Sequence, residues 1–351
     1  MEILELLAFA KKENASDIHI SSGEPPIIRI HGDIRKLDIP PLSNHEVHNI
    51  LYGILTDRHR KDFEEHHELD FSLQYGEMGR FRVNAFIQSR GESIVFRTIP
   101  TVIPTLEQLN MPKIVGELTK KEKGLILVTG PTGSGKSTTL AAMIDLINRD
   151  EKCHILTVED PIEFLHRSKT SLVNQRELGP HTHSFANALR SALREDPDII
   201  LVGEMRDLET ISLALTAAET GHLVFGTLHT SSAPKTVDRI IDVFPPNQQE
   251  QVRTMFSESL QAVITQQLVK KKDGTGRVAA LEIMIGTPAV RNLIRENKIA
   301  QIPSSIQTGR QHGMQTMDQS LIELCQKDLI AKEAAEPLVS SPSVLSSLNK
   351  T

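Results

Sequence analysis

The sequence predicts an α/β protein in two parts: a small α+β domain at the N-terminus and a larger domain with a parallel sheet and a helical C-terminal region. Three observations support this fold class. Residues 1–99 mix short alternating strands with helices, whereas apolar strands alternate with helices from residue 113 onward. In the segment 128–147, VTGPTGSGKSTTLAAMIDLI, a glycine-rich loop joins a strand to a helix. A length of 351 residues favours two or three domains.

The composition argues against several classes of protein. The two cysteines, Cys153 and Cys325, are too few for a disulfide framework or a four-cysteine zinc site. A net charge of −6, the absence of tryptophan and the lack of a long basic block argue against nucleic-acid binding. No apolar run approaches the roughly 20 residues that span a bilayer. The acidic residues within MEILELLAFAKKENASD predict an amphipathic helix and no signal peptide, so we expect a soluble cytoplasmic protein.

The N-terminal domain, residues 1–99, is predicted to be an antiparallel sheet with flanking helices. The segment IIRIHGDIRKL alternates like a strand that turns at Gly32. Residues 68–99 predict three strands, with turns near residues 76–79 and 90–91. Three prolines then fall within residues 100–112, which predicts a linker that can act as a hinge.

Residues 113–336 have the pattern of a parallel sheet buried on both faces. The apolar segments GLILVTG, HILTVED, DIILVGE and HLVFGTLH alternate with helical segments such as SFANALRSALRED. The last hundred residues are predicted to be mainly helical, with a solvated hairpin turn where Lys270–Lys272 meet Asp273 and Gly274. The segment 337–351 is rich in proline and serine and is expected to be a flexible tail.

The loop GPTGSGKST fits the G-x-x-x-x-G-K-[ST] pattern of a phosphate-binding P-loop at Gly130, Gly135, Lys136 and Ser137. Glycines let backbone N–H groups approach phosphates, and the following helix presents its positive N-terminal end. Lys136 should contact the β- and γ-phosphates, and Ser137 should hold Mg²⁺. The flanking strand and helix make a simple surface turn a poor alternative. The other residues expected to line the nucleotide are Thr132, Gly133, Ser134 and Thr138.

Carboxylates gather at the ends of two predicted strands, where ligands of parallel sheets collect. The strand DIILVGE ends at Glu204, and Gly203 stands where such proteins commonly have Asp. The Mg²⁺ contact of Glu204 would therefore run through water, or another carboxylate would supply it. The strand HILTVEDPIEF delivers three more carboxylates: Glu159, Asp160 and Glu163. Either Glu204 or Glu163 is expected to orient the attacking water, while others of the set could cap backbone groups or pair with arginine.

Two histidines flank the buried strand in GHLVFGTLHTSS. His229 follows the strand and should lie at the same sheet edge as the carboxylates, where it could sense the γ-phosphate. A histidine bonded to backbone at a strand end is the alternative. His222 stands at the strand entry and is a weaker candidate for the site.

These segments together resemble the four motifs of the secretion ATPases of type II secretion and type IV pilus systems. The motifs correspond to GPTGSGKST, ILTVEDPIEF, LREDPDIILVGEMRD and GHLVFGTLHT, in matching order over about 100 residues. The segment SDIHISSGEPPIIRIHGDIRKL resembles the start of the family's PAS-like N-terminal domain. The segment AVRNLIRE resembles a motif of the pilus retraction subfamily. The resemblance implies a PAS-like domain followed by a RecA-like ATPase domain.

The resemblance also implies a hexameric ring that binds ATP and Mg²⁺ between the two domains. Arg82 and Arg97 match family positions that reach the phosphates from the N-terminal domain, where a guanidinium would stabilise charge on the γ-phosphoryl group. Strand alternation puts Arg80 on the same face as Arg82, so Arg80 is an alternative. A charged sheet surface would explain these arginines equally well. Arg194, Arg206 and Arg239 could be partners at the ring interface or between the domains.

The helix AVRNLIRENK could be an interaction surface for the output of the motor. Its candidate residues are Arg291 and Arg295 on a charged face, together with Leu293 and Ile294 on an apolar face. An amphipathic helix packed on its own domain fits the same pattern, and the resemblance alone favours the functional interpretation.

The function that the resemblance implies is a hexameric cytoplasmic ATPase motor for type IV pilus retraction and twitching motility. Its partner would be a platform protein of the inner membrane, at the base of the pilus machine, and no nucleic acid is expected. A pilus assembly ATPase or a type II secretion ATPase would share the same active-site chemistry. A RecA-type nucleic-acid translocase is a more distant alternative, which the acidic composition disfavours.

Overall fold

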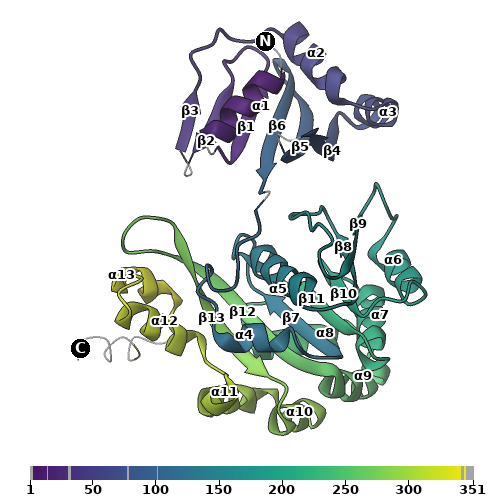
Figure 1. Ribbon diagram of the computed structural model, residues 1–351, viewed down its shortest axis with the longest axis vertical. Coiled ribbons are helices and arrows are strands. Elements are labelled where there is room, and N and C mark those ends of the chain that lie inside the picture. Colours follow the sequence, from purple (N-terminus) through teal and green to yellow (C-terminus); the bar gives the residue numbers. More distant parts are fainter. Residues whose placement is uncertain are drawn as a thin grey trace. The chain divides into compact units, whose positions relative to one another are not determined.

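A computed structural model describes residues 3–13, 15–30, 33–76, 79–100, 102–340 and 344 of the chain (Figure 1). The chain divides into two compact units, an N-terminal unit of Met1–Val102 and a C-terminal unit of Ile103–Thr351. The predicted turn residue Gly32 and most of the predicted tail lie outside the described residues. None of the described helices has the length and apolar character that a membrane crossing requires.

The N-terminal unit is built on a six-stranded antiparallel sheet with the order β3-β2-β1-β6-β5-β4. The three strands predicted within residues 68–99 are confirmed. Residues 17–21, for which no strand was predicted, form a strand between β2 and β6 near the centre of the sheet. The strands are β1 (Asp17–Ser21), β2 (Ile27–Ile30), β3 (Asp33–Lys36), β4 (Glu68–Tyr75), β5 (Gly79–Gln88) and β6 (Gly91–Ile99).

Three helices cover one face of this sheet: α1 (Ile3–Lys12), α2 (Asn44–Ile54) and α3 (Asp57–His66). The predicted amphipathic N-terminal helix is thus confirmed as α1. A capping box starts α2, because the Ser43 side chain accepts from the Glu46 N–H while Glu46 accepts from the Ser43 N–H. Alternate residues of the strands, such as Val83 and Phe96, are fully buried under the helices. The opposite face carries polar side chains, including Arg82 and Arg97, which are directly paired in register.

The C-terminal unit contains a seven-stranded sheet with the order β13-β12-β7-β11-β10-β8-β9. All neighbouring strands are parallel except the pair β12 and β13, so the predicted parallel sheet is confirmed with one antiparallel edge. The strands are β7 (Gly124–Thr129), β8 (His154–Glu159), β9 (Leu172–Glu177), β10 (Ile199–Val202), β11 (Leu223–Leu228), β12 (Leu260–Lys270) and β13 (Arg277–Ile285).

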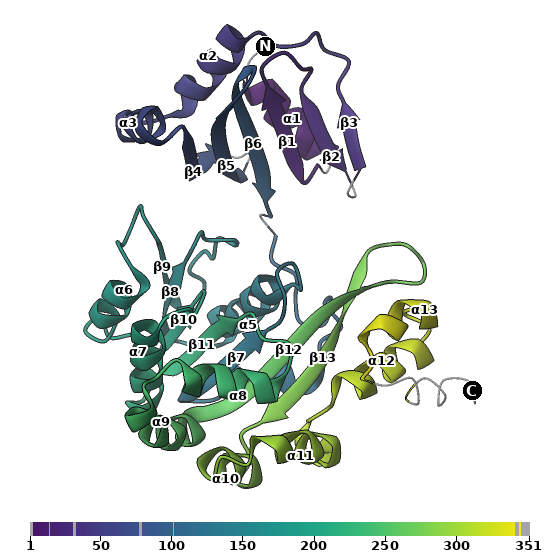
Figure 2. The same cartoon turned by 180° about the vertical axis from the view of Figure 1, so that it is seen from behind.

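Helices cover both faces of this sheet, which explains why its central strands are apolar throughout. The helices α4 (Lys113–Leu118) and α5 (Lys136–Asp150) lie on one face (Figure 1). The other face is covered by the helices seen in front in Figure 2: α7 (Leu208–Glu219), α8 (Ala233–Asp242) and α9 (Pro246–Ser259). The same core includes α6 (Phe185–Ala192), α10 (Pro288–Arg295) and α11 (Ile302–Thr308).

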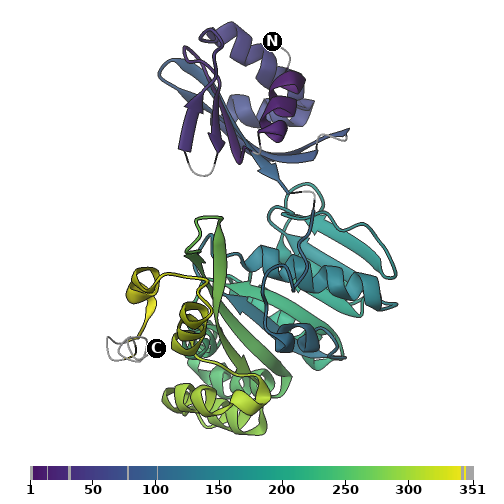
Figure 3. The same ribbon diagram turned by 60° about the vertical axis from the view of Figure 1, so that its left-hand side comes forward.

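The prediction that the last hundred residues are mainly helical is wrong for residues 260–285. These residues form the long hairpin of β12 and β13, and β12 pairs in parallel with β7, the strand that leads into the P-loop. The predicted solvated turn after Lys270 is confirmed as the tip of this hairpin. Two helices, α12 (Met317–Gln326) and α13 (Lys332–Ala335), pack against the hairpin in a small core of their own (Figure 3).

Candidate functional site

The candidate site lies at the edge of the seven-stranded sheet where the parallel strands end. The loops that follow β7, β8, β10 and β11 all leave the sheet at this edge. They carry, in that order, the P-loop, the Glu159 to Glu163 segment, Glu204 and His229. Topology therefore brings together the four predicted motifs.

The P-loop is held in a conformation that requires its glycines. Gly135 is the N-cap of α5 with φ of 87°, and Gly130 has φ of 141°, so both adopt backbone angles that other residues rarely reach. The Lys136 ammonium is buried and donates to the carbonyl oxygens of Gly130, at 2.8 Å, and of Pro131, at 3.1 Å. Thr132 and Gly133 form the exposed tip of the loop, whereas Ser134 is buried; Ser137 and Thr138 lie in the first turn of α5.

A residue that sequence analysis missed lies against the P-loop. Gln266 of β12 is buried, and its side-chain amide donates to the Ser134 carbonyl at 2.7 Å while accepting from the Thr139 hydroxyl at 2.8 Å. Nothing in the local sequence around Gln266 marks it, because these contacts join segments more than a hundred residues apart.

Glu204 is the centre of an ionic cluster. Its Oε1 is 2.8 Å from Nε2 of His229, and it also forms an ion pair with Arg206. Burial raises the pKa of Glu204, but Arg206 and His229 lower it by more, so the carboxyl stays below its usual range and charged. Arg206, expected at the ring interface or between the domains, contacts a predicted site residue of its own unit.

Glu159 lies in a different environment from Glu204. Its Oε1 accepts from the Thr157 hydroxyl at 2.6 Å and from the Gln175 amide at 3.1 Å. Burial raises the pKa of Glu159 to about 7, against the smaller lowering effect of these hydrogen bonds. The neighbouring Asp160 is exposed.

A small cavity of about 30 Å³, enough to admit a water molecule, lies between the P-loop helix and the carboxylates that follow β8. Ser137 lines it from α5, and Glu159 and Glu163 line it from the loop after β8. His166 lines it as well, and burial lowers the pKa of this histidine to about 4, so the ring is neutral. Ser137, Glu159 and Glu163 thus bring oxygen atoms to a cavity next to the P-loop, whose lining also includes the apolar side chains of Leu140, Ala141, Phe164 and Leu201.

Within the N-terminal unit, both predicted arginines are held by carboxylates. Arg97 Nε donates to Asp17 Oδ1 at 2.8 Å, and Arg82 Nε donates to Asp70 Oδ1 at 3.1 Å. Although burial raises the pKa of Asp17, the bond from Arg97 and a second from Ser16 bring it below its usual range. The side chain of Arg97 remains 66% exposed, so its guanidinium is accessible while it is paired.

The other candidates do not lie with the motifs. His222 is at the start of β11, at the opposite end from His229, and its Nδ1 lies 3.0 Å from the carbonyl of Ala217. This geometry matches a histidine bonded to backbone and removes His222 from the site.

The interaction surface predicted on residues 289–298 is corrected at Arg291 and Ile294, whose side chains contact their own unit. Arg291 donates to three backbone carbonyls, those of Gly286, Glu258 and Leu260, and Ile294 is fully buried in the core of its own unit. Leu293 packs against the same core, which leaves Arg295 as the exposed member of the predicted set. The pattern is thus that of a helix packed on its own domain.

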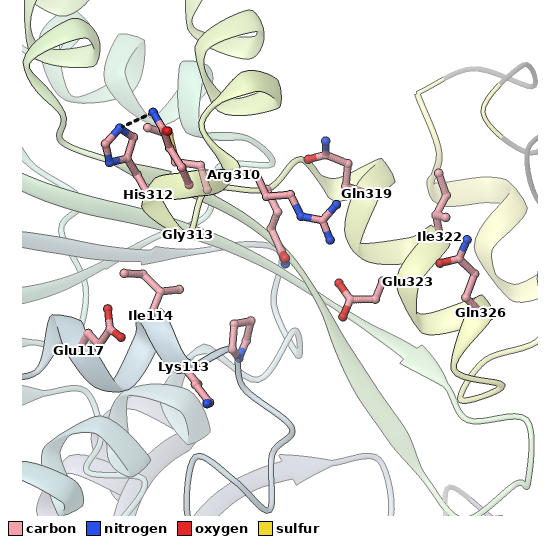
Figure 4. Close-up of a pocket in the computed structure, with 14 residues that line it drawn as sticks. Lys113, Ile114, Glu117, Arg310, His312, Gly313, Gln319, Ile322, Glu323 and Gln326 are labelled. Carbon is pink, nitrogen blue, oxygen red and sulfur yellow. Dashed lines mark hydrogen bonds between the residues drawn. The ribbon is translucent and has the colours of Figure 1, made fainter.

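A larger groove of about 680 Å³ lies elsewhere on the C-terminal unit (Figure 4). It is lined by α4, the segment 310–315 and α12, and none of its lining residues belongs to the four motif loops. The Arg310 side chain extends toward α12, which carries Gln319 and Glu323. Size alone would select this groove, but the phosphate-binding glycines and the carboxylates identify the smaller site as the chemical one.

Comparison with known proteins agrees with this geometry. The family described as Type II/IV secretion system protein matches residues 2–335. The type IV pilus retraction ATPase PilT of Pseudomonas aeruginosa is 61% identical over 342 residues, which cover 97% of this chain and 99% of the relative. A twitching motility protein of Neisseria gonorrhoeae is 60% identical over 326 residues, which cover 91% of this chain and 87% of the relative. The crystal structure of the pilus retraction motor PilT with bound ADP matches with a TM-score of 0.93 at 50% identity, and the match covers 99% of each chain.

A P-loop that faces carboxylates at the edge of a parallel sheet defines a nucleoside triphosphate hydrolase, and the chain belongs to the Type II/IV secretion system protein family. Within this family it is an ATPase of the type IV pilus retraction kind. The predicted fold class, enzymatic activity and function are confirmed.

Proposed function

We propose that the chain retracts type IV pili by hydrolysing MgATP at the edge of its seven-stranded sheet, in a homo-hexamer. The observation that carries the chemical part of the proposal is the convergence of Lys136 and Ser137 with Glu163 and Glu204. Burial lowers the pKa of Lys136, whereas the carboxylates of Glu204 and Glu163 act to raise it, so both acidic groups lie within electrostatic range of the ammonium. A phosphate chain bound at Lys136 would therefore lie next to both carboxylates.

Each P-loop residue has a distinct task in this proposal. The loop from Gly130 to Gly135 presents backbone N–H groups to the phosphates, and Lys136 exchanges its bonds to Gly130 and Pro131 for phosphate oxygens. The Ser137 hydroxyl and the carboxylates around the small cavity form an oxygen donor set that fits Mg²⁺. When bound, Mg²⁺ would neutralise the charge that develops on the β- and γ-phosphates.

The two carboxylates divide the remaining work. Glu163 is exposed and borders the cavity beside Ser137. We therefore assign Glu163 the role of general base: it orients the attacking water and accepts a proton from it. Glu204 is already paired with Arg206 and His229, and it fixes the imidazole where it can contact the γ-phosphate.

We also propose, from the resemblance to the family, that Arg82 and Arg97 of the N-terminal unit contact the phosphates during the catalytic cycle. Arg82 and Arg97 are register partners on the helix-free face of the sheet, and Arg97 lies two residues before the end of β6, which runs into the linker. To reach the phosphates, they would exchange Asp70 and Asp17 for phosphate oxygens. This exchange would couple the nucleotide state to the position of the N-terminal unit about the 100–112 linker.

The proposal includes the setting of the motor. Six copies form a ring in the cytoplasm, at the inner-membrane base of the pilus machine, and a platform protein of the inner membrane receives the motion. The full-length similarity to a pilus retraction motor supports this setting. Light scattering on the purified chain should give six times the chain mass, and a stable monomer with full ATPase activity would contradict the ring.

The direction of work is tested in cells whose only copy carries Lys136→Ala. Because this change removes the charge that binds phosphate, we expect pili that extend and do not retract when imaged. The matched control is Lys152→Ala, which removes an exposed lysine of the same unit and should retract normally. Loss of pili in the Lys136→Ala strain would instead indicate an assembly ATPase.

The division between carboxylates is tested with purified protein. Glu163→Gln should lower kcat by about a hundredfold or more with little change in the affinity for ATP, because a general base acts in the chemical step. Glu204→Gln should also lower kcat, through displacement of His229. Full activity of Glu163→Gln would transfer the role of base to Glu204.

A further inference from the structure

The side-chain amide of Gln266 joins the P-loop to the helix that follows it. Its Nε2 donates to the Ser134 carbonyl at 2.7 Å, and its Oε1 accepts from the Thr139 hydroxyl at 2.8 Å. Ser134 is the last residue before Gly135, and Thr139 lies one turn into α5. The amide therefore bridges the segment that contains Lys136 and Ser137.

Gln266 also leaves no room for a side chain at two positions of the P-loop. A Cβ atom placed on Gly130 would lie 2.3 Å from the Gln266 carbonyl oxygen, and a Cβ on Gly135 would lie 2.8 Å from Gln266 Nε2. The strand pairing explains this approach, since Thr265 is opposite Thr129 in the parallel pair of β12 and β7. Both glycines that define the loop are thus in contact with one residue from a distant strand.

We propose that Gln266 is a positioning residue that holds the P-loop in its phosphate-binding conformation. The chemistry is specific to an amide, because one end must donate to a carbonyl while the other end accepts from a hydroxyl. A carboxylate would place an acceptor against the Ser134 carbonyl, and an apolar side chain would leave both partners without their bonds in a buried environment. Gln266 does not touch the nucleotide in this proposal; it acts through Ser134 and α5.

The test compares Gln266→Met with Gln267→Met in the full-length protein. Methionine has a similar length and no amide, and Gln267 is the next residue of β12, half-buried and on the other face of the strand. We expect Gln266→Met to raise the Kd for ADP and the KM for ATP about tenfold, which is the loss typical of a buried hydrogen-bonded contact. At saturating ATP, kcat should stay within about twofold. Because Gln266→Met leaves two buried polar groups without partners, its Tm should fall below that of Gln267→Met, and both variants are compared at a temperature at which each is folded.

Two further variants keep the inference testable if Gln266→Met folds poorly. Thr139→Val removes the hydroxyl that donates to the amide while keeping the side-chain volume, and it should weaken ADP binding in the same direction by a smaller factor. Gln266→Glu should weaken ADP binding more than Gln266→Met. An unchanged Kd for ADP in both Gln266→Met and Thr139→Val would overturn the proposal. It would also be overturned if the loss of activity in these variants were fully explained by a smaller fraction of folded protein.

The inference relies on nucleotide binding at the P-loop, and Lys136→Ala separates the two claims. If Lys136→Ala weakens ADP binding and Gln266→Met does not, the positioning role fails while the proposed site stands. If Lys136→Ala leaves ADP binding intact, the proposed site itself fails.

Discussion

Replacing Glu159 by glutamine should remove a titration that makes the C-terminal unit less stable as the pH rises. The pKa of this carboxyl is raised from 4.5 to about 7, chiefly by burial. Below pH 4.5 the carboxyl is protonated in the folded and unfolded chains, and its contribution to stability is complete. Between these two pKa values the unfolded chain releases its proton first, so the free energy of unfolding falls, and above about pH 7 the loss is complete.

The size of the effect follows from the two pKa values. Each unit of difference corresponds to about 1.4 kcal/mol, so the folded state loses about 3 kcal/mol between pH 4 and pH 8 through this one group. Glutamine retains an oxygen that can accept from Thr157 and Gln175, so the local hydrogen bonds survive the substitution. The variant should therefore gain stability relative to the parent chain as the pH rises, and by about that amount.

The assay is urea-induced unfolding without nucleotide, followed by circular dichroism from about pH 4 to pH 8. The quantity compared is the difference in the free energy of unfolding between Glu159→Gln and the parent chain. Glu122→Gln, at an exposed position of the same unit, is the control and should show a difference that does not vary with pH. A difference for Glu159→Gln that stays constant over the whole range would refute the reasoning.

Three further predictions concern single contacts. Gly130→Ala should abolish ADP binding in a titration, because its φ of 141° and the nearby Gln266 carbonyl leave no room for a Cβ atom. Arg291→Met should lower the free energy of unfolding by about 3 kcal/mol through the loss of three hydrogen bonds to carbonyls, with kcat nearly unchanged in the folded protein. Ser43→Ala should lower the stability of the N-terminal unit by about 1 kcal/mol in urea unfolding through the loss of a capping box, and an unchanged midpoint would contradict this.

The P-loop and the carboxylate edge were predictable because their signals are local. The residues from Gly130 to Ser137 are continuous, and an apolar strand and a helix flank them. Glu159 ends the strand β8, and Glu204 lies two residues after the strand β10, so the rule that parallel strands end at one edge placed them together. The direction of β11 determines which of its two flanking histidines lies at the site. His222 precedes the strand and lies at the far edge of the sheet, whereas His229 follows the strand and lies at the carboxylate edge.

The turn between β12 and β13 was predicted, but the two strands were missed, because glutamines interrupt the apolar pattern of β12. Gln261 and Gln266 are polar residues in a mostly buried strand, and they are tolerated because each bonds to a distant segment, the carbonyls of Lys123 and Ser134. The role of Arg291 was hidden for a related reason. A helix with one charged and one apolar face fits a partner surface and its own core equally well, and only the three carbonyls around the guanidinium separate the two.

The close approach of β12 to the phosphate loop limits how this ATPase can be re-engineered. A grafted loop with any residue other than glycine at these positions would bring a Cβ atom against the Gln266 carbonyl at position 130 or the Gln266 amide at position 135. A graft that keeps both glycines must still offer a carbonyl to the Gln266 amide where Ser134 does. The loop and its neighbouring hairpin therefore form one transplantable module. Chimeras that exchange the loop alone should fold without nucleotide affinity, and chimeras that exchange the loop together with β12 and β13 should retain it.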